Sequence, residues 1–189
     1  MARAKQYNEQ EVIEKAMSLF WRNGYESTSV RMLEKEMGIN QFSIYASFGS
    51  KHGVFLESLK CYKRKNASVF EKLQNGTEGV SDIKAFFYDS VEMPTKIGEF
   101  DNKGCLLTNT YNEFANNEDQ LIQLQMTEFM DHLKAVFVQK LAVNSSKDEA
   151  TIAKQANYLV LAKHGLAAAS RVNNKQEIED YIELTFQNI

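Results

Sequence analysis

The chain has 189 residues, 43% of them hydrophobic, and a formal net charge of −3 at pH 7. This composition can fill the core of one compact unit or of two closely packed subdomains. The apolar runs are too short to span a bilayer, and the N-terminal charges are not followed by the apolar run of a leader segment. We therefore expect a cytoplasmic protein, and two cysteines in different predicted helices suggest neither a disulfide framework nor a cysteine-rich metal site.

Long stretches with apolar residues three and four positions apart predict an all-α fold of about nine helices, and no alternating segment predicts a strand. The charge is divided unevenly along the chain. Residues 1–65 hold eleven basic and seven acidic side chains, a net charge of +4, and the remainder has a net charge of −7. This division is typical of a basic DNA-binding head joined to a body that DNA does not attract.

The first predicted helix begins near Asn8, which with Glu11 has the spacing of a capping box, and stops at Gly24. Residues 28–55 then predict two short helices around a glycine turn, followed at once by another helix. Thr28 or Ser29 is suited to cap the first of these, Gly38 ends it, and Asn40 caps the second. This is the layout of a helix-turn-helix, whose second helix enters the major groove of DNA.

The second helix of the pair leaves a polar and aromatic face outward when Ile44 and Phe48 point inward. Ser50 can cap the helix that follows, and Lys51 lies in its first turn, where the helix dipole alone favours an acid. A bound phosphate would explain that lysine, because it satisfies both the cation and the free N–H groups. The predicted DNA-binding residues are Thr28, Ser29, Arg31, Asn40, Gln41, Phe42, Ser43, Tyr45 and Lys51.

About residues 9–57 resemble the DNA-binding domain of the TetR family of bacterial repressors. The motifs that carry the resemblance are the stretch from Ala16 to Phe20, Gly24-Tyr25, Thr28-Ser29, Gly38-Ile39, Ile44-Tyr45, Phe48, Ser50-Lys51 and Phe55. The resemblance implies a dimer formed by the last two helices of each subunit and an inducer held among the body helices. Gln41, Phe42 and Ala46 depart from residues common in the family, so the operator sequence is not predicted.

The predicted domains are a helix-turn-helix domain over residues 1–50 and a helical effector-binding and dimerisation body over residues 51–189. A long helix from about 51 to 73 joins them. Further helices are expected at about 80–93, 105–116, 118–142, 149–172 and 176–187.

The middle of the body is rich in aromatic and methionine side chains. From the pattern alone such a stripe is more often hydrophobic core than a ligand site. The family resemblance shifts the balance toward a small apolar or aromatic effector. The candidate effector-binding residues are Tyr88, Phe100, Cys105, Asn109, Tyr111, Phe114, Met126, Phe129, Met130 and His164.

Cys105 is expected in the first turn of a helix that Asn102 caps, beside Lys103. A helix N-terminus and a nearby cation both stabilise a thiolate, which predicts a reactive thiol. The alternative is that Cys105 is a small buried hydrophobe, and Cys61, in mid-helix, is expected to be inert.

The run from Tyr158 to Ala169 is broadly apolar and rich in small side chains that permit close helix approach. It predicts either an intramolecular core helix or a dimer interface. We favour a dimer, because helix-turn-helix proteins usually read two half-sites about one DNA turn apart. The candidate interface residues are Leu161, Gly165, Ala168, Ala169, Tyr181 and Leu184.

Enzyme motifs are not found: there is no glycine-rich phosphate loop, clustered Cys/His set or nucleophile elbow, and the pair Glu128 and His132 is typical of a solvated surface. We expect no enzyme activity, cofactor or metal. The predicted function is a homodimeric, sequence-specific transcriptional regulator, a repressor that a small effector releases from a palindromic operator. The alternatives are a helical enzyme that binds a small molecule and an interaction protein without DNA binding.

Overall fold

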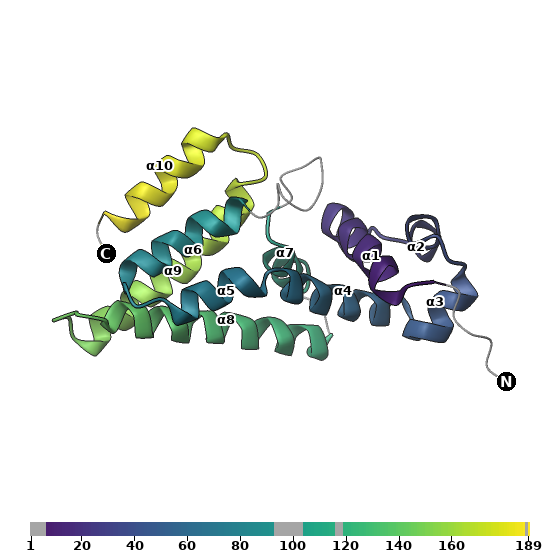
Figure 1. Cartoon of the computed structure of the whole chain (residues 1–189), viewed down its shortest axis with the longest axis horizontal. Coiled ribbons are helices and arrows are strands. Elements are labelled where there is room, and N and C mark those ends of the chain that lie inside the picture. The colour runs from purple at the N-terminus through teal and green to yellow at the C-terminus, as the bar shows by residue number, and fades with distance from the viewer. Residues whose placement is uncertain (1–6, 93–103, 116–118, 188) are drawn as a thin grey trace. The chain divides into compact units, whose positions relative to one another are not determined.

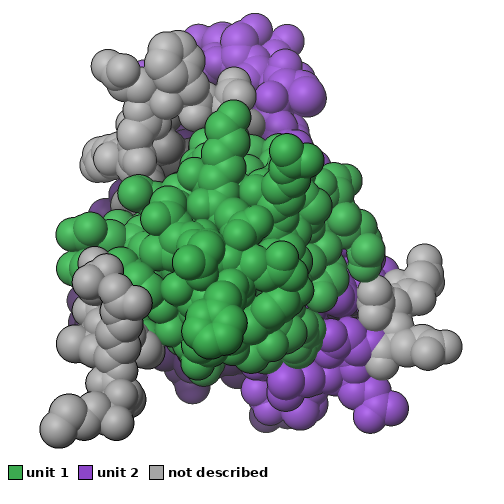
Figure 2. Space-filling model, turned by 90° about the vertical axis from the view of Figure 1, so that its right-hand side faces the viewer, with its two compact units in different colours: residues 1–65 green, residues 66–189 purple. Residues whose placement is uncertain are grey.

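The computed structural model of the chain describes residues 7–92, 104–115, 119–187 and 189. Within these residues it has ten helices and no strand, which confirms the predicted all-α fold with one helix more than expected. The helices form two compact units, residues 1–65 and residues 66–189, coloured separately in Figure 2.

Unit 1 contains helices α1 (Glu9–Asn23), α2 (Val30–Met37), α3 (Gln41–Phe48) and α4 (Lys51–Lys65), labelled in Figure 1. Helix α1 buries one face against α4 and α2. At the centre, the rings of Phe20 and Phe55 meet edge to face with centroids 4.9 Å apart. Both side chains are almost completely buried, so this aromatic contact joins α1 to α4 through the core of the unit.

Local capping defines the helix boundaries of unit 1 as the sequence predicts. The Asn8 side chain accepts hydrogen bonds at the start of α1, Ser29 accepts from the Met32 N–H, and Asn40 accepts from the Ser43 N–H. Gly38 ends α2 in the left-handed conformation, with φ of 70°. The turn between α2 and α3 therefore follows from local chemistry.

The predicted helix over residues 51–73 is wrong, because it is interrupted at Asn66. Helix α4 ends at Lys65, and α5 (Ala67–Asn75) begins after Asn66, whose carbonyl oxygen accepts from the Val69 N–H at 3.2 Å. The last turn of α4 carries Lys63, Arg64 and Lys65, whose charges suit the negative end of the helix dipole. The first compact unit ends at residue 65, because α4 packs on α1. The domain boundary at residue 50 stays a prediction.

Unit 2 contains α5, α6 (Val80–Glu92), α7 (Leu106–Glu113), α8 (Gln120–Ala142), α9 (Glu149–Ala169) and α10 (Lys175–Phe186). The long helices α8 and α9 pack side by side, and α6 contacts both, as Figure 1 shows. Fully buried Phe87, Phe137, Leu159 and Ile182 come from α6, α8, α9 and α10 and meet in one core. All the long helices of unit 2 therefore contribute to one hydrophobic core.

Two groups of polar contacts join the helices of unit 2, one at Glu183 and one at Lys140. The Tyr88 hydroxyl donates to Glu183 at 2.6 Å and the Lys84 ammonium pairs with the same carboxylate at 2.7 Å, which ties α6 to α10. The hydrogen bond to Glu183 is the main reason that the pKa of Tyr88 is raised to about 12. On α8, buried Lys140 donates to the carbonyl oxygens of Gln74 and Gly76 and lies 3.6 Å from Asp82. Lys140 therefore caps the C-terminal end of α5.

Replacing Lys140 by methionine should lower the free energy of unfolding by about 2–4 kcal/mol, because two carbonyl groups and the Asp82 carboxylate lose a buried partner. The measurement is urea unfolding near pH 7. Lys134→Met is the matched control, since Lys134 lies on the same helix and forms no hydrogen bond or ion pair with the described residues. Equal stability of the two variants would contradict this role for Lys140.

Candidate DNA-binding surface and effector region

Helix α3 presents an exposed face that combines amide, aromatic and hydroxyl groups. Its only buried residue is Ile44, whereas Gln41 is exposed, Phe42 is 81% exposed and Tyr45 is 42% exposed. Two large aromatic side chains exposed on the same short helix are a feature of interaction surfaces. The face has the residue types that read base edges and methyl groups in a major groove.

The N-terminus of α3 is held by two side chains. Asn40 caps it from within the turn, and the Glu34 carboxylate of α2 accepts from the Gln41 backbone N–H. The Tyr7 hydroxyl reaches α3 from outside the helical pair and lies 2.6 Å from the Ser47 hydroxyl. These contacts fix the first and the last turn of a helix that buries little surface of its own.

Gln41 and Tyr45 form one hydrogen-bonded unit on the exposed face. The Gln41 amide nitrogen donates to the Tyr45 hydroxyl oxygen at 3.0 Å, one helical turn away. The Gln41 carbonyl oxygen and the Tyr45 hydroxyl proton are not used by this bond. The pair can therefore offer an acceptor and a donor in a fixed relation to the helix.

Lys51 lies at the start of α4, beside the N-terminal turn that Ser50 caps by accepting from the Gly53 N–H at 3.1 Å. Its ammonium group lies 4.2 Å from the centre of the Tyr25 ring, within cation–π range. The aromatic ring orients the lysine without neutralising it. A cation and a helix N-terminus at one place are suited to a phosphate.

Thr28 does not belong to the exposed face. It is completely buried, and its hydroxyl donates to the Gly24 carbonyl oxygen at 2.7 Å, so its side chain stabilises the turn before α2. Ser29 and Arg31 are both exposed at the start of α2. Thr28 is thus the only one of the predicted DNA-binding residues that is buried.

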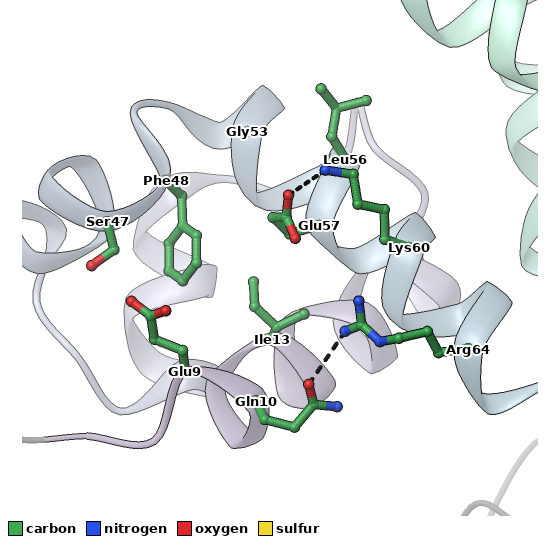
Figure 3. A pocket seen from close by; sticks show the side chains of 10 residues that line it. All are labelled: Glu9, Gln10, Ile13, Ser47, Phe48, Gly53, Leu56, Glu57, Lys60 and Arg64. Atoms are coloured by element: carbon green, nitrogen blue, oxygen red, sulfur yellow. Dashed lines mark hydrogen bonds and ion pairs between the residues drawn. The ribbon is translucent and has the colours of Figure 1, made fainter.

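Unit 1 also contains a pocket of about 400 Å³ between α1, the end of α3 and α4 (Figure 3). Its polar wall includes Glu57 paired with Lys60 at 2.7 Å, and Arg64, which donates to the side-chain amide oxygen of Gln10 at 3.2 Å. None of the predicted DNA-binding residues lines it. The pocket differs from the apolar cavity expected in the body, and its charges largely satisfy one another.

In unit 2, four predicted effector residues lie around one end of α9. The rings of Tyr111 and His164 have centroids 5.5 Å apart, and the His164 ring nitrogen lies 3.0 Å from the Met130 sulfur. Cys105 is half-buried at the N-cap of α7. The start of α7 approaches α9 closely at Gly104, where a Cβ atom would lie 2.4 Å from the Ala167 carbonyl oxygen.

The other predicted effector residues are distributed differently. Phe114 and Met126 are buried in the core, Phe129 and Asn109 are half-buried, and the Tyr88 hydroxyl is engaged by Glu183. Phe100 lies outside the described residues, as do Asn102 and Lys103, which the prediction for Cys105 invoked. Cys61 is buried, and burial raises the pKa of its thiol.

Lys163 was not among the residues predicted from the sequence, and it is only 6% exposed on the face of α9 that packs against the body. Its ammonium group lies 5.8 Å from the centre of the Phe86 ring. Burial lowers the pKa of Lys163, and the neighbouring Cys105 acts in the opposite direction. Burial, with a contribution from Lys163, also lowers the pKa of His164. The available signal was a single lysine within the apolar run from Tyr158 to Ala169.

The predicted interface residues occupy an exposed apolar row on α9 and α10. Leu161 is 68% exposed, Leu184 is 60% exposed, and Gly165 and Ala168 are exposed. Ala169 is half-buried, and half-buried Tyr181 donates its hydroxyl to the Ala162 carbonyl oxygen at 2.9 Å. Exposed Tyr158 extends the row on α9, because positions 158, 161, 165 and 168 share one helical face.

Unit 1, with its exposed α3, has the arrangement of a helix-turn-helix domain. Residues 12–58 match the sequence family described as bacterial regulatory proteins, tetR family. The match confirms the resemblance that the motif residues indicated. Within the described ranges no helix has the length and apolarity needed to cross a membrane, and no three His, Cys, Asp or Glu side chains gather as metal ligands.

The chain is similar to regulators of known sequence and structure. A segment of 125 residues, 64% of the chain, is 30% identical to the uncharacterised HTH-type transcriptional regulator YezE of Bacillus subtilis (strain 168) and spans 62% of it. Another of 69 residues, 36% of the chain, is 36% identical to the repressor ComR of Escherichia coli (strain K12) and spans 33% of it. The chain thus spans less than two thirds of either relative.

Among solved structures, the TetR-family regulator CifR, as a cysteine mutant complexed with 26-bp operator DNA, has the same fold. Its TM-score is 0.80 at 18% identity over 97% of each chain. The named relatives are all transcriptional regulators.

Replacing Lys163 by methionine should raise the free energy of unfolding by about 1–3 kcal/mol near pH 7, because an unpaired buried charge is removed. The gain should shrink as the pH rises. The pKa of Lys163 is lower in the folded state than in the unfolded state. At pH values between these two pKa values, the unfolded wild type binds more protons than the folded wild type. The free energy of unfolding of the wild type therefore increases with pH in this range.

The measurement is urea unfolding at pH 7 and pH 9.5 for wild type, Lys163→Met and Lys154→Met. Lys154 is exposed on the same helix and serves as the control. Cys105 and His164 are the titratable neighbours, and both are present in every variant. A destabilised Lys163→Met protein, or a stability gain independent of pH, would contradict a buried charged lysine.

Proposed function

We propose that the chain is a homodimeric, sequence-specific DNA-binding regulator, a repressor that leaves a palindromic operator when a small molecule binds unit 2. The observation that carries the proposal is the exposed face of α3 in a TetR-family domain, with Gln41, Phe42 and Tyr45 presented together. The structural neighbour CifR, which has the same fold, forms a complex with operator DNA, and this supports DNA binding by the present chain.

In the proposed complex, α3 lies in the major groove. The amide of Gln41 can pair with an adenine edge, and the ring of Phe42 can contact a thymine methyl group. The Tyr45 hydroxyl, Lys51, Ser29 and Arg31 contact phosphates, which supply affinity without sequence information. The net charge of +4 over residues 1–65 favours this docking, and the net charge of −7 over the remainder disfavours DNA contact by the body.

Dimerisation uses the exposed apolar row on α9 and α10. An exposed apolar row of this kind, on a helix whose other face packs in the core, is suited to pair with its own copy across a two-fold axis. Gly165 and Ala168 permit close approach of the paired helices. The same axis places two copies of α3 on successive half-sites of one operator.

Release by an effector requires two states of the dimer. The effector must bind the state that cannot span both half-sites better than the state that can, since otherwise no shift occurs. The cluster of Cys105, Tyr111, Met130 and His164 supports an effector site in unit 2.

The experiment that tests the proposed function is selection of bound sequences from random duplex DNA by the purified protein. The expected product is an inverted repeat bound in a salt-sensitive manner. Turnover of a small molecule without DNA selection would favour a helical enzyme. A dimer with neither property would favour an interaction protein.

Lys51→Ala should weaken binding to the selected operator and to random DNA alike, and it should make the dependence of log K on log salt shallower by about one. Gln41→Ala and Phe42→Ala should instead change which sequences are bound. The measurement is fluorescence anisotropy at several salt concentrations. Lys72→Ala in unit 2 removes the same charge and should leave the salt slope unchanged, and an unaltered slope for Lys51→Ala would argue against this docking.

Ala168→Glu should give monomers and weaken operator binding by at least about 100-fold, because the two half-sites are then bound independently. Ala168 is exposed within the chain, so each monomer should remain folded by circular dichroism. Analytical ultracentrifugation measures the oligomeric state, and Ala135→Glu, at an exposed position on α8, is the control. A dimeric Ala168→Glu protein would move the interface to another surface.

A further inference from the structure

We infer that unit 2 binds a small organic anion whose acidic group pairs with the ammonium group of Lys163. The inference deepens the proposed function, on which it rests for its regulatory meaning, by assigning a chemical class to the effector. Its starting point is the position of Lys163: nine-tenths buried on α9, in the same unit as the predicted effector residues.

Lys163 has no built-in partner of opposite charge in the described part of the chain. No carboxylate there lies within ion-pair distance of its nitrogen, and no hydrogen bond to that nitrogen is formed with the described residues. The contrast is Lys140, the other lysine that is 6% exposed, which has two carbonyl acceptors and Asp82. Lys140 is therefore satisfied by the fold, and Lys163 is not.

The contacts that Lys163 does make cannot compensate for its burial. The Phe86 ring offers only a weak cation–π contact, because its centre lies 5.8 Å from the ammonium group, near the limit of the range for such contacts. Removing an ammonium ion from water is costly unless a counter-charge or hydrogen bonds replace the water. The Cys105 sulfur favours the charged lysine but supplies a full counter-charge only as a thiolate. A bound anion would supply the counter-charge that the described residues do not.

The surroundings of Lys163 indicate the form of the ligand. Phe86 offers an aromatic ring beside the ammonium group, and the adjacent residue His164 contacts Met130 and Tyr111. Tyr111 is 39% exposed and Cys105 is half-buried, so the cluster reaches the surface. An acid group on a small apolar or aromatic body fits a single cation among these side chains. A neutral analogue of the same shape would leave the lysine unpaired.

The test compares three carboxylates with their neutral alcohols: benzoate with benzyl alcohol, phenylacetate with 2-phenylethanol, and hexanoate with 1-hexanol. Binding is measured by titration calorimetry and by the shift in Tm, at constant ionic strength near pH 7. We expect at least one acid to bind wild type, with its alcohol binding about tenfold or more weakly. Lys163→Met should lose the preference for the acid, and Lys163→Arg, which keeps a cation, should retain it.

Three results would overturn the inference: no acid binds wild type, acid and alcohol bind equally, or the acid preference survives in Lys163→Met. The acid–alcohol comparison in wild type keeps the test decisive if that variant misfolds, and Lys163→Gln provides a second neutral variant. Operator binding by wild type is measured separately. Acid binding without operator binding would leave the anion site standing and defeat the regulator, and the converse would leave the regulator and defeat the anion site.

Discussion

The packing of α1 against α4 is the contact on which the DNA-binding surface depends. Helix α3 has eight residues and buries only Ile44, so it cannot hold its position through its own hydrophobic contacts. The contact between Phe20 and Phe55 joins the two longer helices, and Tyr25 packs on the same Phe55 ring with centroids 4.9 Å apart. The ammonium group of Lys51 lies over the ring of Tyr25. The same aromatic cluster therefore packs α1 against α4 and positions the cation that is suited to a phosphate. The polar contacts from Glu34, Asn40 and Tyr7 then set where α3 starts and how it lies.

The two units use charge in opposite ways. The cations of unit 1 lie at the surface, where salt screens them. There they can replace the counterions that surround the phosphates of DNA. Unit 2 is acidic overall but encloses two lysines, one satisfied by backbone carbonyls and a carboxylate and one without such partners. A buried cation without a counter-charge makes an unliganded site less stable than a liganded one. Binding an anion there would thus release free energy that a two-state regulator can use to change its DNA affinity.

Much of unit 1 could be predicted from the sequence because its determinants are local. The caps at Ser29 and Asn40 and the left-handed Gly38 act within a few residues, and they define the helix-turn-helix. The break at Asn66 was missed because neither glycine nor proline marks it, and the burial of Thr28 was missed because a threonine before a helix is usually an exposed cap. Lys163 could not be placed, since its burial depends on α6 and α7, which are distant in the sequence. The apolar row on α9 was visible as a pattern, but only the structure shows that this face is exposed.

Hydroxyl-radical footprinting on the selected duplex tests most directly whether two copies of α3 bind one operator. The account predicts two protected segments related by two-fold symmetry, with centres about one helical turn, or a small multiple of it, apart. Protection of both segments should appear together as protein is added, because the dimer binds as a unit. A single protected segment, or uniform protection along the duplex, would contradict the account.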